Sequence, residues 1–166
     1  MEISLNSAGL RDWDGSVLII GMFEGALEEQ LKAFDFPLLT HLTSQLKEQK
    51  FKAKTGEVAS FNLPENTPKK LILIGLGEAK QLLINDLRNA AALGARSSLG
   101  SIGKLGVLFP WDLFEPESAA KAVGEAIRLS LFKDLRFKSK PEPLIQAENI
   151  ELIGIQESAN KCLAEI

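Results

Sequence analysis

A short apolar run closed by glycines, Lys69-Lys-Leu-Ile-Leu-Ile-Gly-Leu-Gly77, most constrains what this chain can fold into. Residues 71–74 are apolar without a break, and such a run before glycine is typical of a strand that is buried on both faces of its sheet. A strand of this kind needs helices on both sides of the sheet. Glycine at the carboxyl end of the strand lets another backbone, or a ligand, approach closely because no Cβ stands in the way.

The rest of the chain alternates between segments typical of strands and segments typical of helices. Short apolar or alternating runs predict strands over residues 1–7, 15–21, 58–63, 103–110 and 149–155. Helical patterns are found over 24–33, 35–46, 82–98, 118–132 and from 157 onward. Strands that alternate with helices predict an α/β fold, namely a three-layer α/β/α sandwich around a mostly parallel or mixed sheet.

The expected helices each have one face suited to packing. The second should begin with Asp35 as N-cap and Pro37 in its first turn. Its apolar stripe consists of Leu38, Leu42 and Leu46. In the helix over 82–98 the shared face contains small residues that let the helix lie close to a neighbour. This face consists of Leu83, Leu87, Ala90, Ala91 and Gly94. In the helix over 118–132 it consists of Ala119, Val123, Ile127 and Leu131.

Composition and charge restrict the class of protein. A chain of 166 residues with a net charge of −3 is expected to form one domain, and its charge argues neither for nucleic acid nor for an anionic membrane as partner. The single cysteine, Cys162, excludes an internal disulfide. No secretory signal and no apolar window long enough for a membrane span is visible, so we predict a cytoplasmic protein. The last helical pattern reaches Ile166 without a stop signal, which hints at a cut within a longer polypeptide.

Few residues stand in arrangements that carry out chemistry. His41 is the only histidine, and it has neither a second histidine nor the cysteines that a zinc site requires. No Gly-x-Ser-x-Gly nucleophile elbow is present. Carboxylates such as Glu28 and Glu115 are expected on a solvated helix face and at a helix start, respectively. We therefore predict no catalytic, no cofactor-binding and no metal-ligating residue in this chain.

The glycines that follow the central strand leave a nucleotide-binding alternative open. Gly75-Leu-Gly77 matches the first part of the dinucleotide fingerprint, but Lys80 stands where the third glycine belongs. A plain turn from strand to helix is therefore the expected structure.

Two basic segments leave a nucleic-acid alternative open. Residues 128–140 combine basic side chains with Phe132 and Phe137, a composition that can contact phosphates and stack on bases. The competing interpretations are a helix end enriched in cations with the phenylalanines packed inward, or a contact between subunits. The lysines at 50, 52 and 54 form a second, weaker basic cluster with the same ambiguity.

Four segments in a fixed order resemble the N-terminal domain of the leucyl aminopeptidase family, the cytosol aminopeptidases. They are Phe51-Lys-Ala-Lys-Thr-Gly-Glu57, Lys70-Leu-Ile-Leu-Ile-Gly-Leu-Gly77, Leu129-Ser-Leu-Phe-Lys-Asp-Leu-Arg-Phe-Lys-Ser139 and Asn149-Ile-Glu-Leu-Ile-Gly-Ile155. The chain departs from the family pattern at Ala53, where glycine is typical, and at Phe137, where tyrosine is typical. The opening Asp14-Gly-Ser-Val-Leu-Ile-Ile-Gly-Met-Phe-Glu24 is also similar.

This resemblance implies a macro-domain-like fold over residues 1–155, with 156–166 as the start of a helix that links to a separate C-terminal catalytic domain. In the family that domain holds two divalent metals, manganese or zinc among them, which activate water for attack on the peptide bond. Neither of its metal-binding segments occurs in this sequence, so no catalytic residue is carried over. The resemblance also implies a hexamer, peptide substrates that bind to the catalytic domain, and no membrane partner.

A rival interpretation from another class is a free-standing macro-like module that binds ADP-ribose or a related nucleotide. It rests on the glycines at 75 and 77 and on their expected place at the carboxyl end of a strand. Nucleic acid remains a less favoured partner.

Overall fold

The computed structural model of the chain describes residues 2–7, 9–10, 13–34, 39–63, 67–132 and 147–159. These residues contain a six-stranded sheet made of β1 (Glu2–Asn6), β2 (Val17–Phe23), β3 (Val58–Asn62), β4 (Lys70–Gly77), β5 (Lys104–Leu108) and β6 (Asn149–Ile153). The strands lie in the order β1-β6-β5-β2-β4-β3. Every neighbouring pair is parallel except β3 and β4, which are antiparallel. The predicted mostly parallel sheet is therefore confirmed.

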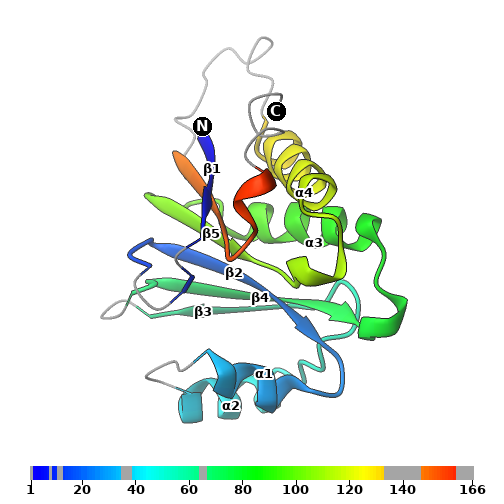
Figure 1. Cartoon of the computed structure of the whole chain (residues 1–166). Coiled ribbons are helices and arrows are strands. Elements are labelled where there is room, and N and C mark those ends of the chain that lie inside the picture. Colours follow the sequence, from blue (N-terminus) through cyan, green and yellow to red (C-terminus); the bar gives the residue numbers. More distant parts are fainter. Residues whose placement is uncertain are drawn as a thin grey trace, which may run out of the picture.

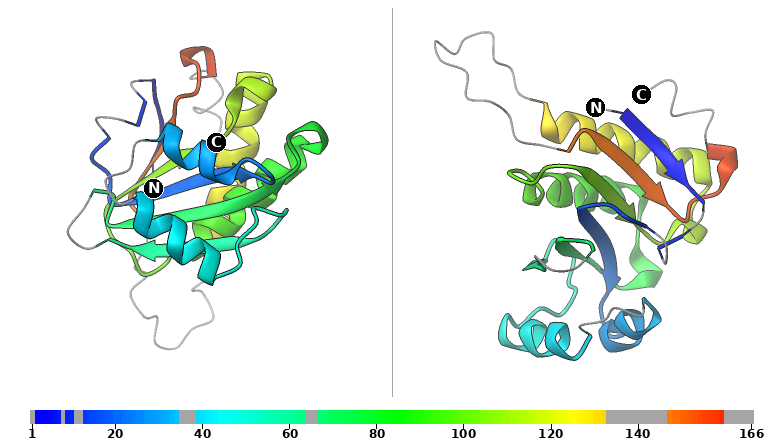
Figure 2. Two further views of the ribbon diagram at one scale, coloured as in Figure 1. Left: turned by 90° about the horizontal axis from the view of Figure 1, so that it is seen from below. Right: turned by 90° about the vertical axis from the view of Figure 1, so that its left-hand side faces the viewer.

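Helices cover both faces of this sheet (Figure 1). On one face lie α1 (Leu27–Ala33) and α2 (Leu39–Glu48), and on the other lie α3 (Ile84–Ser97) and α4 (Pro116–Leu131). Figure 2 shows the same layers from below, with α1 and α2 in front of the strands and α3 and α4 behind them. Three short 3-10 turns complete the described elements, η1 (Ala79–Gln81), η2 (Trp111–Leu113) and η3 (Glu157–Ala159). The predicted three-layer α/β/α sandwich is confirmed.

Two neighbouring strands of the sheet, β2 and β4, contribute to both hydrophobic cores. Successive side chains of a strand point to opposite faces, so Ile19 and Ile72 pack under α3 and α4 while Leu18 and Leu71 pack over α1 and α2. All four side chains are fully buried. Because neither face of these strands meets water, their sequences are apolar without alternation, as the run at residues 71–74 predicts.

The small face predicted for α3 is confirmed with one exception. Leu87, Ala90, Ala91 and Gly94 are buried, and a Cβ on Gly94 would lie only 2.8 Å from Cδ1 of Ile19 in β2. Leu83, which we expected on the same face, is 65% exposed. The prediction was wrong there because the helix begins at Ile84, and Leu83 is the extended N-cap residue whose N–H donates to the Asp86 carboxylate at 2.8 Å.

The predicted turn at the glycines of β4 is also wrong, because the strand continues through Gly77. α3 follows after η1 rather than directly. The helix predicted over 118–132 begins two residues earlier, at Pro116, and its four predicted core residues, Ala119, Val123, Ile127 and Leu131, are all buried. Proline at the first helical position accounts for the early start, since its fixed φ suits a helix and its missing N–H is not needed there.

The ends of two other predicted helices lie outside the described residues. Asp35, Pro37 and Leu38 belong to that part of the chain, whereas Leu42 and Leu46 of the predicted stripe are buried in the core beneath α2. Of the helix predicted from residue 157, only the turn η3 is described. None of the helices in the described part of the chain combines the length and the hydropathy that a bilayer crossing requires.

Candidate functional site

The carboxyl end of β4 is in direct contact with the segment 51–57, which leads into β3. The Gly75 N–H donates to the carbonyl oxygen of Glu57 at 2.8 Å, and the Gly75 carbonyl oxygen accepts from the Gly56 N–H at 3.0 Å. Two residues further on, the Gly77 N–H donates to the carbonyl oxygen of Ala53 at 2.9 Å. A Cβ on Gly75 would collide with the carbonyl oxygen of Lys54. Of the two partners that we expected for these glycines, backbone or ligand, the structure therefore shows backbone.

The segment 51–57 is held in place by its own acidic residue. The Glu57 carboxylate accepts the N–H of Lys52 at 2.8 Å and the N–H of Lys54 at 3.2 Å, closing a tight loop. Between these lysines, Ala53 is fully buried and adopts φ of 60°, a left-handed conformation that costs an L-residue about 1 kcal/mol. The lysine side chains are exposed, so within this loop Phe51 and Ala53 are buried while the two charges remain at the surface.

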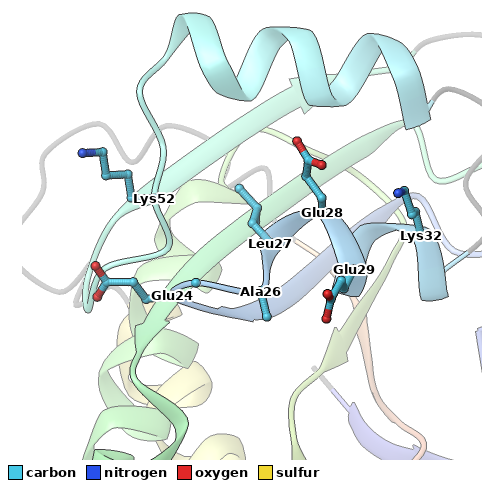
Figure 3. A pocket seen from close by; sticks show the side chains of 8 residues that line it. Glu24, Ala26, Leu27, Glu28, Glu29, Lys32 and Lys52 are labelled. Atoms are coloured by element: carbon cyan, nitrogen blue, oxygen red, sulfur yellow. The ribbon is translucent and has the colours of Figure 1, made fainter.

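A hollow of about 650 Å³ lies beside this loop, where β2 passes into α1 (Figure 3). Its lining includes three acidic residues, Glu24, Glu28 and Glu29, and two basic ones, Lys32 and Lys52. Figure 3 shows the three carboxylates pointing in three different directions rather than toward one point. The Glu28 carboxylate instead forms an exposed ion pair with Lys47 of α2 at 3.6 Å. The hollow thus lacks the convergent polar groups that orient a bound ligand.

The most connected polar group of the described residues lies where β5 and β6 run side by side. The Glu151 carboxylate accepts hydrogen bonds from the Trp13 indole N–H at 3.0 Å and from the Asn6 amide at 2.9 Å. The Lys104 ammonium lies 3.1 Å from Glu151 and 2.8 Å from Asp14. These five side chains, which we call the Glu151 cluster, connect β1, β5 and β6 to the segment that enters β2.

The ionisation of the Glu151 cluster follows from these contacts. Burial raises the pKa of Glu151, but the hydrogen bonds from Asn6, Lys104 and Trp13 outweigh burial and hold the pKa below its usual value. The hydrogen bond and the charge of Lys104 likewise lower the pKa of Asp14. The hydrogen bonds to Asp14 and Glu151 raise the pKa of Lys104. Asp14, Lys104 and Glu151 are therefore charged at neutral pH. They stabilise the contact between these strands and do not serve as an acid and a base.

Sequence reasoning did not single out the Glu151 cluster. Trp13 and Glu151 are 138 positions apart, and Lys104 and Asp14 are 90 positions apart, so no local spacing connects them. One signal was available in the sequence, namely a charged residue at position 151 between the apolar residues Ile150 and Leu152 of β6. Such a residue needs a partner when the strand is half buried.

The residues considered for chemistry in the sequence remain apart from one another. His41 is exposed on α2, and Cys162 lies outside the described residues. Glu115 is the N-cap of α4 and accepts the Ser118 N–H at 2.8 Å and the Glu117 N–H at 3.2 Å. These hydrogen bonds, first that from Ser118, lower the pKa of Glu115. The part of the chain that the structure describes contains no group of three or more His, Cys, Asp or Glu side chains suited to a metal ion.

The basic aromatic segment 128–140 is described only as far as residue 132. Arg128 is exposed at the end of α4. Phe132, which the competing interpretation packed inward, is 72% exposed, so that interpretation is wrong for this residue. The reason is that α4 ends at Leu131, whose side chain takes the last core position, while Phe132 is the extended C-cap residue. Phe137 lies outside the described residues.

The fold and the contacts at the end of β4 define an α/β/α domain in which the described residues 53–57 pack backbone against backbone at Gly75 and Gly77. Residues 19–141 match the model of the cytosol aminopeptidase family, N-terminal domain. A probable cytosol aminopeptidase of Prochlorococcus marinus (strain MIT 9313) is 49% identical over 166 residues, covering all of this chain and 34% of that relative. The chain therefore belongs to the cytosol aminopeptidase family, and it spans about a third of the length of the curated relatives that it matches.

Two solved structures share the fold. A mutant of tomato leucine aminopeptidase superposes with a TM-score of 0.73 at 20% identity, over 99% of this chain and 35% of that chain. The bottromycin maturation enzyme BotP in complex with Mn superposes with a TM-score of 0.61 at 18% identity, over 90% of this chain and 28% of that chain. At these identities the likeness establishes the fold alone.

Proposed function

We propose that this chain is the non-catalytic N-terminal domain of a leucyl aminopeptidase whose full-length form releases N-terminal amino acids from peptides. The observation that carries the proposal is the family match over residues 19–141, made by a model of the N-terminal domain. The relatives that cover all of this chain are probable cytosol aminopeptidases about three times as long. The catalytic part of such a protein would follow this domain.

The proposed enzyme uses two divalent metals, manganese or zinc, in the C-terminal catalytic domain. The metals would supply an activated water for attack on the peptide carbonyl. BotP, which shares the fold of this domain, was solved in complex with Mn. Within the described residues of this chain, the carboxylates of Glu24, Glu28 and Glu29 diverge, and Glu57, Glu115 and Glu151 accept hydrogen bonds from the chain itself. These donor sets do not fit a divalent metal, and the proposal therefore places the metals in the C-terminal catalytic domain.

The finer parts of the proposal rest on the resemblance to the family. They are a macro-domain-like fold over residues 1–155, a linking helix that begins in 156–166, a hexameric assembly, a cytoplasmic location, and peptide substrates bound by the catalytic domain. The partners would be the C-terminal catalytic domain of the same polypeptide and further copies of it. ADP-ribose is not proposed as a ligand, because the backbone of residues 53–56 fills the place in front of Gly75.

Hydrolysis of leucine p-nitroanilide, measured with manganese or zinc added, tests the proposal. We expect no release of p-nitroaniline above the metal-only blank from the purified 166-residue chain. We expect metal-dependent release from a chimera that joins this chain to the remainder of the Prochlorococcus marinus relative. Turnover by the 166-residue chain alone would contradict the proposal, and so would an inactive chimera whose parent relative is active.

A further inference from the structure

The edge strand β3 presents a row of backbone groups that no strand of the described chain pairs with. β3 is the last strand in the sheet order and pairs only with β4 there. Hydrogen bonds flank this pairing at both ends, with the Gly75 N–H donating to Glu57 and the Leu63 N–H donating to Lys69. Hydrogen-bonding direction alternates along an antiparallel strand, so the odd-numbered residues of β3 face β4. The N–H and C=O groups of Val58, Ser60 and Asn62 therefore point outward from the sheet.

The side chains of β3 leave this edge accessible on one face. Ala59 and Phe61 are buried in the core with α1 and α2, whereas Val58 is 39% exposed and Ser60 and Asn62 are exposed. The edge is seen at the end of the sheet beyond β4 in Figure 1.

The composition of β3 lacks the devices that normally protect an edge. Natural edge strands carry charged residues, proline or bulges that prevent pairing with another chain. The five residues of β3, Val-Ala-Ser-Phe-Asn, include no charge, proline or glycine, and its register with β4 is unbroken. The opposite edge strand, β1, begins with the exposed charge of Glu2.

We propose that β3 pairs with β3 of a second copy of this chain, antiparallel about a two-fold axis at Ser60. In this register Ser60 faces Ser60 of the partner and Val58 faces Asn62, so the three outward-facing residues of each copy form hydrogen-bonded pairs. No like charges meet across the axis, and the strand is complementary to itself, as a two-fold interface requires. Two sheets of this kind would join into one continuous sheet. This inference is independent of the proposed function.

The proposed interface is small, because edge pairing of short strands buries less area than a permanent dimer. We therefore expect reversible association with a dissociation constant of about 100 µM or below. We expect analytical ultracentrifugation of the 166-residue chain, at protein concentrations below and above this value, to show an average mass that rises toward twice the 18.1 kDa chain mass.

Charge substitution at the two-fold axis tests the register directly. Directly opposed like charges destabilise an antiparallel pair, and opposed unlike charges stabilise it. We expect Ser60→Lys alone and Ser60→Glu alone to weaken association at least tenfold, and an equimolar mixture of the two variants to restore it. Ser158→Lys, at an exposed serine in η3, is the matched control and should associate like the unchanged chain. Circular dichroism of each variant checks that the fold is kept, which we expect since the Ser60 side chain is exposed.

Loss of association in both single variants with recovery in the mixture supports pairing through β3. A chain that stays monomeric at every concentration overturns the proposal. So does a dimer that Ser60→Lys leaves intact, because its interface would lie elsewhere, and so does a mixture that fails to recover.

Discussion

Gly75 is the position at which a single added atom would disturb the most backbone. Its N–H and C=O bind residues 57 and 56 of the crossing segment, and its missing side chain leaves room for the carbonyl group of Lys54. The opposing atoms belong to main chain rather than to a flexible side chain. They can move only if the whole segment 51–57 moves.

We therefore expect Gly75→Ala to lower the free energy of unfolding by about 3 kcal/mol, the upper range for overpacking. Urea unfolding followed by tryptophan fluorescence measures this change. Gly100→Ala is the control, since Gly100 has φ of 85° and no heavy atom near its added Cβ, and its cost should be the backbone term alone, about 1 kcal/mol. Equal losses of unfolding free energy in the two variants would contradict this expectation, because segment 51–57 would then move aside at little cost.

Glu151 is the residue at which we expect a pH dependence of the free energy of unfolding. A carboxyl whose pKa is lowered in the folded state stabilises the fold fully above its unfolded pKa, near 4.5, and loses that contribution as the pH falls through the folded pKa. We expect Glu151→Gln to cost about 1.5 kcal/mol at pH 7, since hydrogen bonds to a charged group are lost. The difference from the unchanged chain should shrink as the pH falls below 4.5.

Urea midpoints measured between pH 7 and pH 3 check this expectation. Lys104→Met is the companion variant, because it removes the cation that favours the charged form of Glu151. In Lys104→Met, the urea midpoint should depend less on pH below 4.5 than it does in the unchanged chain. A constant gap between Glu151→Gln and the unchanged chain at every pH would contradict the assigned role.

At the scale of elements, α3 lies against β2 because one of its residues has no side chain. Gly94→Ala should raise helix propensity by about 1 kcal/mol but bring its Cβ to within 2.8 Å of the Ile19 side chain. We expect the clash to prevail, with a net loss of about 1–2 kcal/mol. In an Ile19→Ala background the clash is gone, so the same Gly94→Ala change should become stabilising. Additive effects in this double-mutant cycle, measured by urea unfolding, would refute close packing at this point.

Elements with strong periodicity were predictable from sequence, and their ends were not. The buried strand at 71–74 and the α4 face through Ala119, Val123, Ile127 and Leu131 follow from local spacing alone. The position of Leu83 does not, because an exposed N-cap and a buried first turn differ by one residue in the start of the helix. The turn expected at Gly75 failed for a different reason. Its glycine serves a contact with residues 53–57, and contacts across about twenty positions leave no periodic pattern.

The same reasoning explains what was missed at the candidate site. The resemblance identified the family from four ordered segments, and the family match bears it out. The Glu151 cluster was invisible beforehand because its members come from four separate parts of the chain. Long-range polar contacts depend on the sheet order, and the sheet order was not predictable from the sequence of one chain.

At the scale of the whole molecule, the sheet joins nearly the two extremes of the described chain. Glu2 in β1 is paired with Asn149 in β6, 147 positions later (149 − 2), and β6 is the sole sheet neighbour of β1 among the described strands. At a synthesis rate of about 5–20 residues per second, β1 leaves the ribosome roughly 7 to 30 seconds before β6 does. During that interval β1 is on the nascent chain without β6, its sheet neighbour, so we expect β1 to join the sheet only after the other five described strands have been translated.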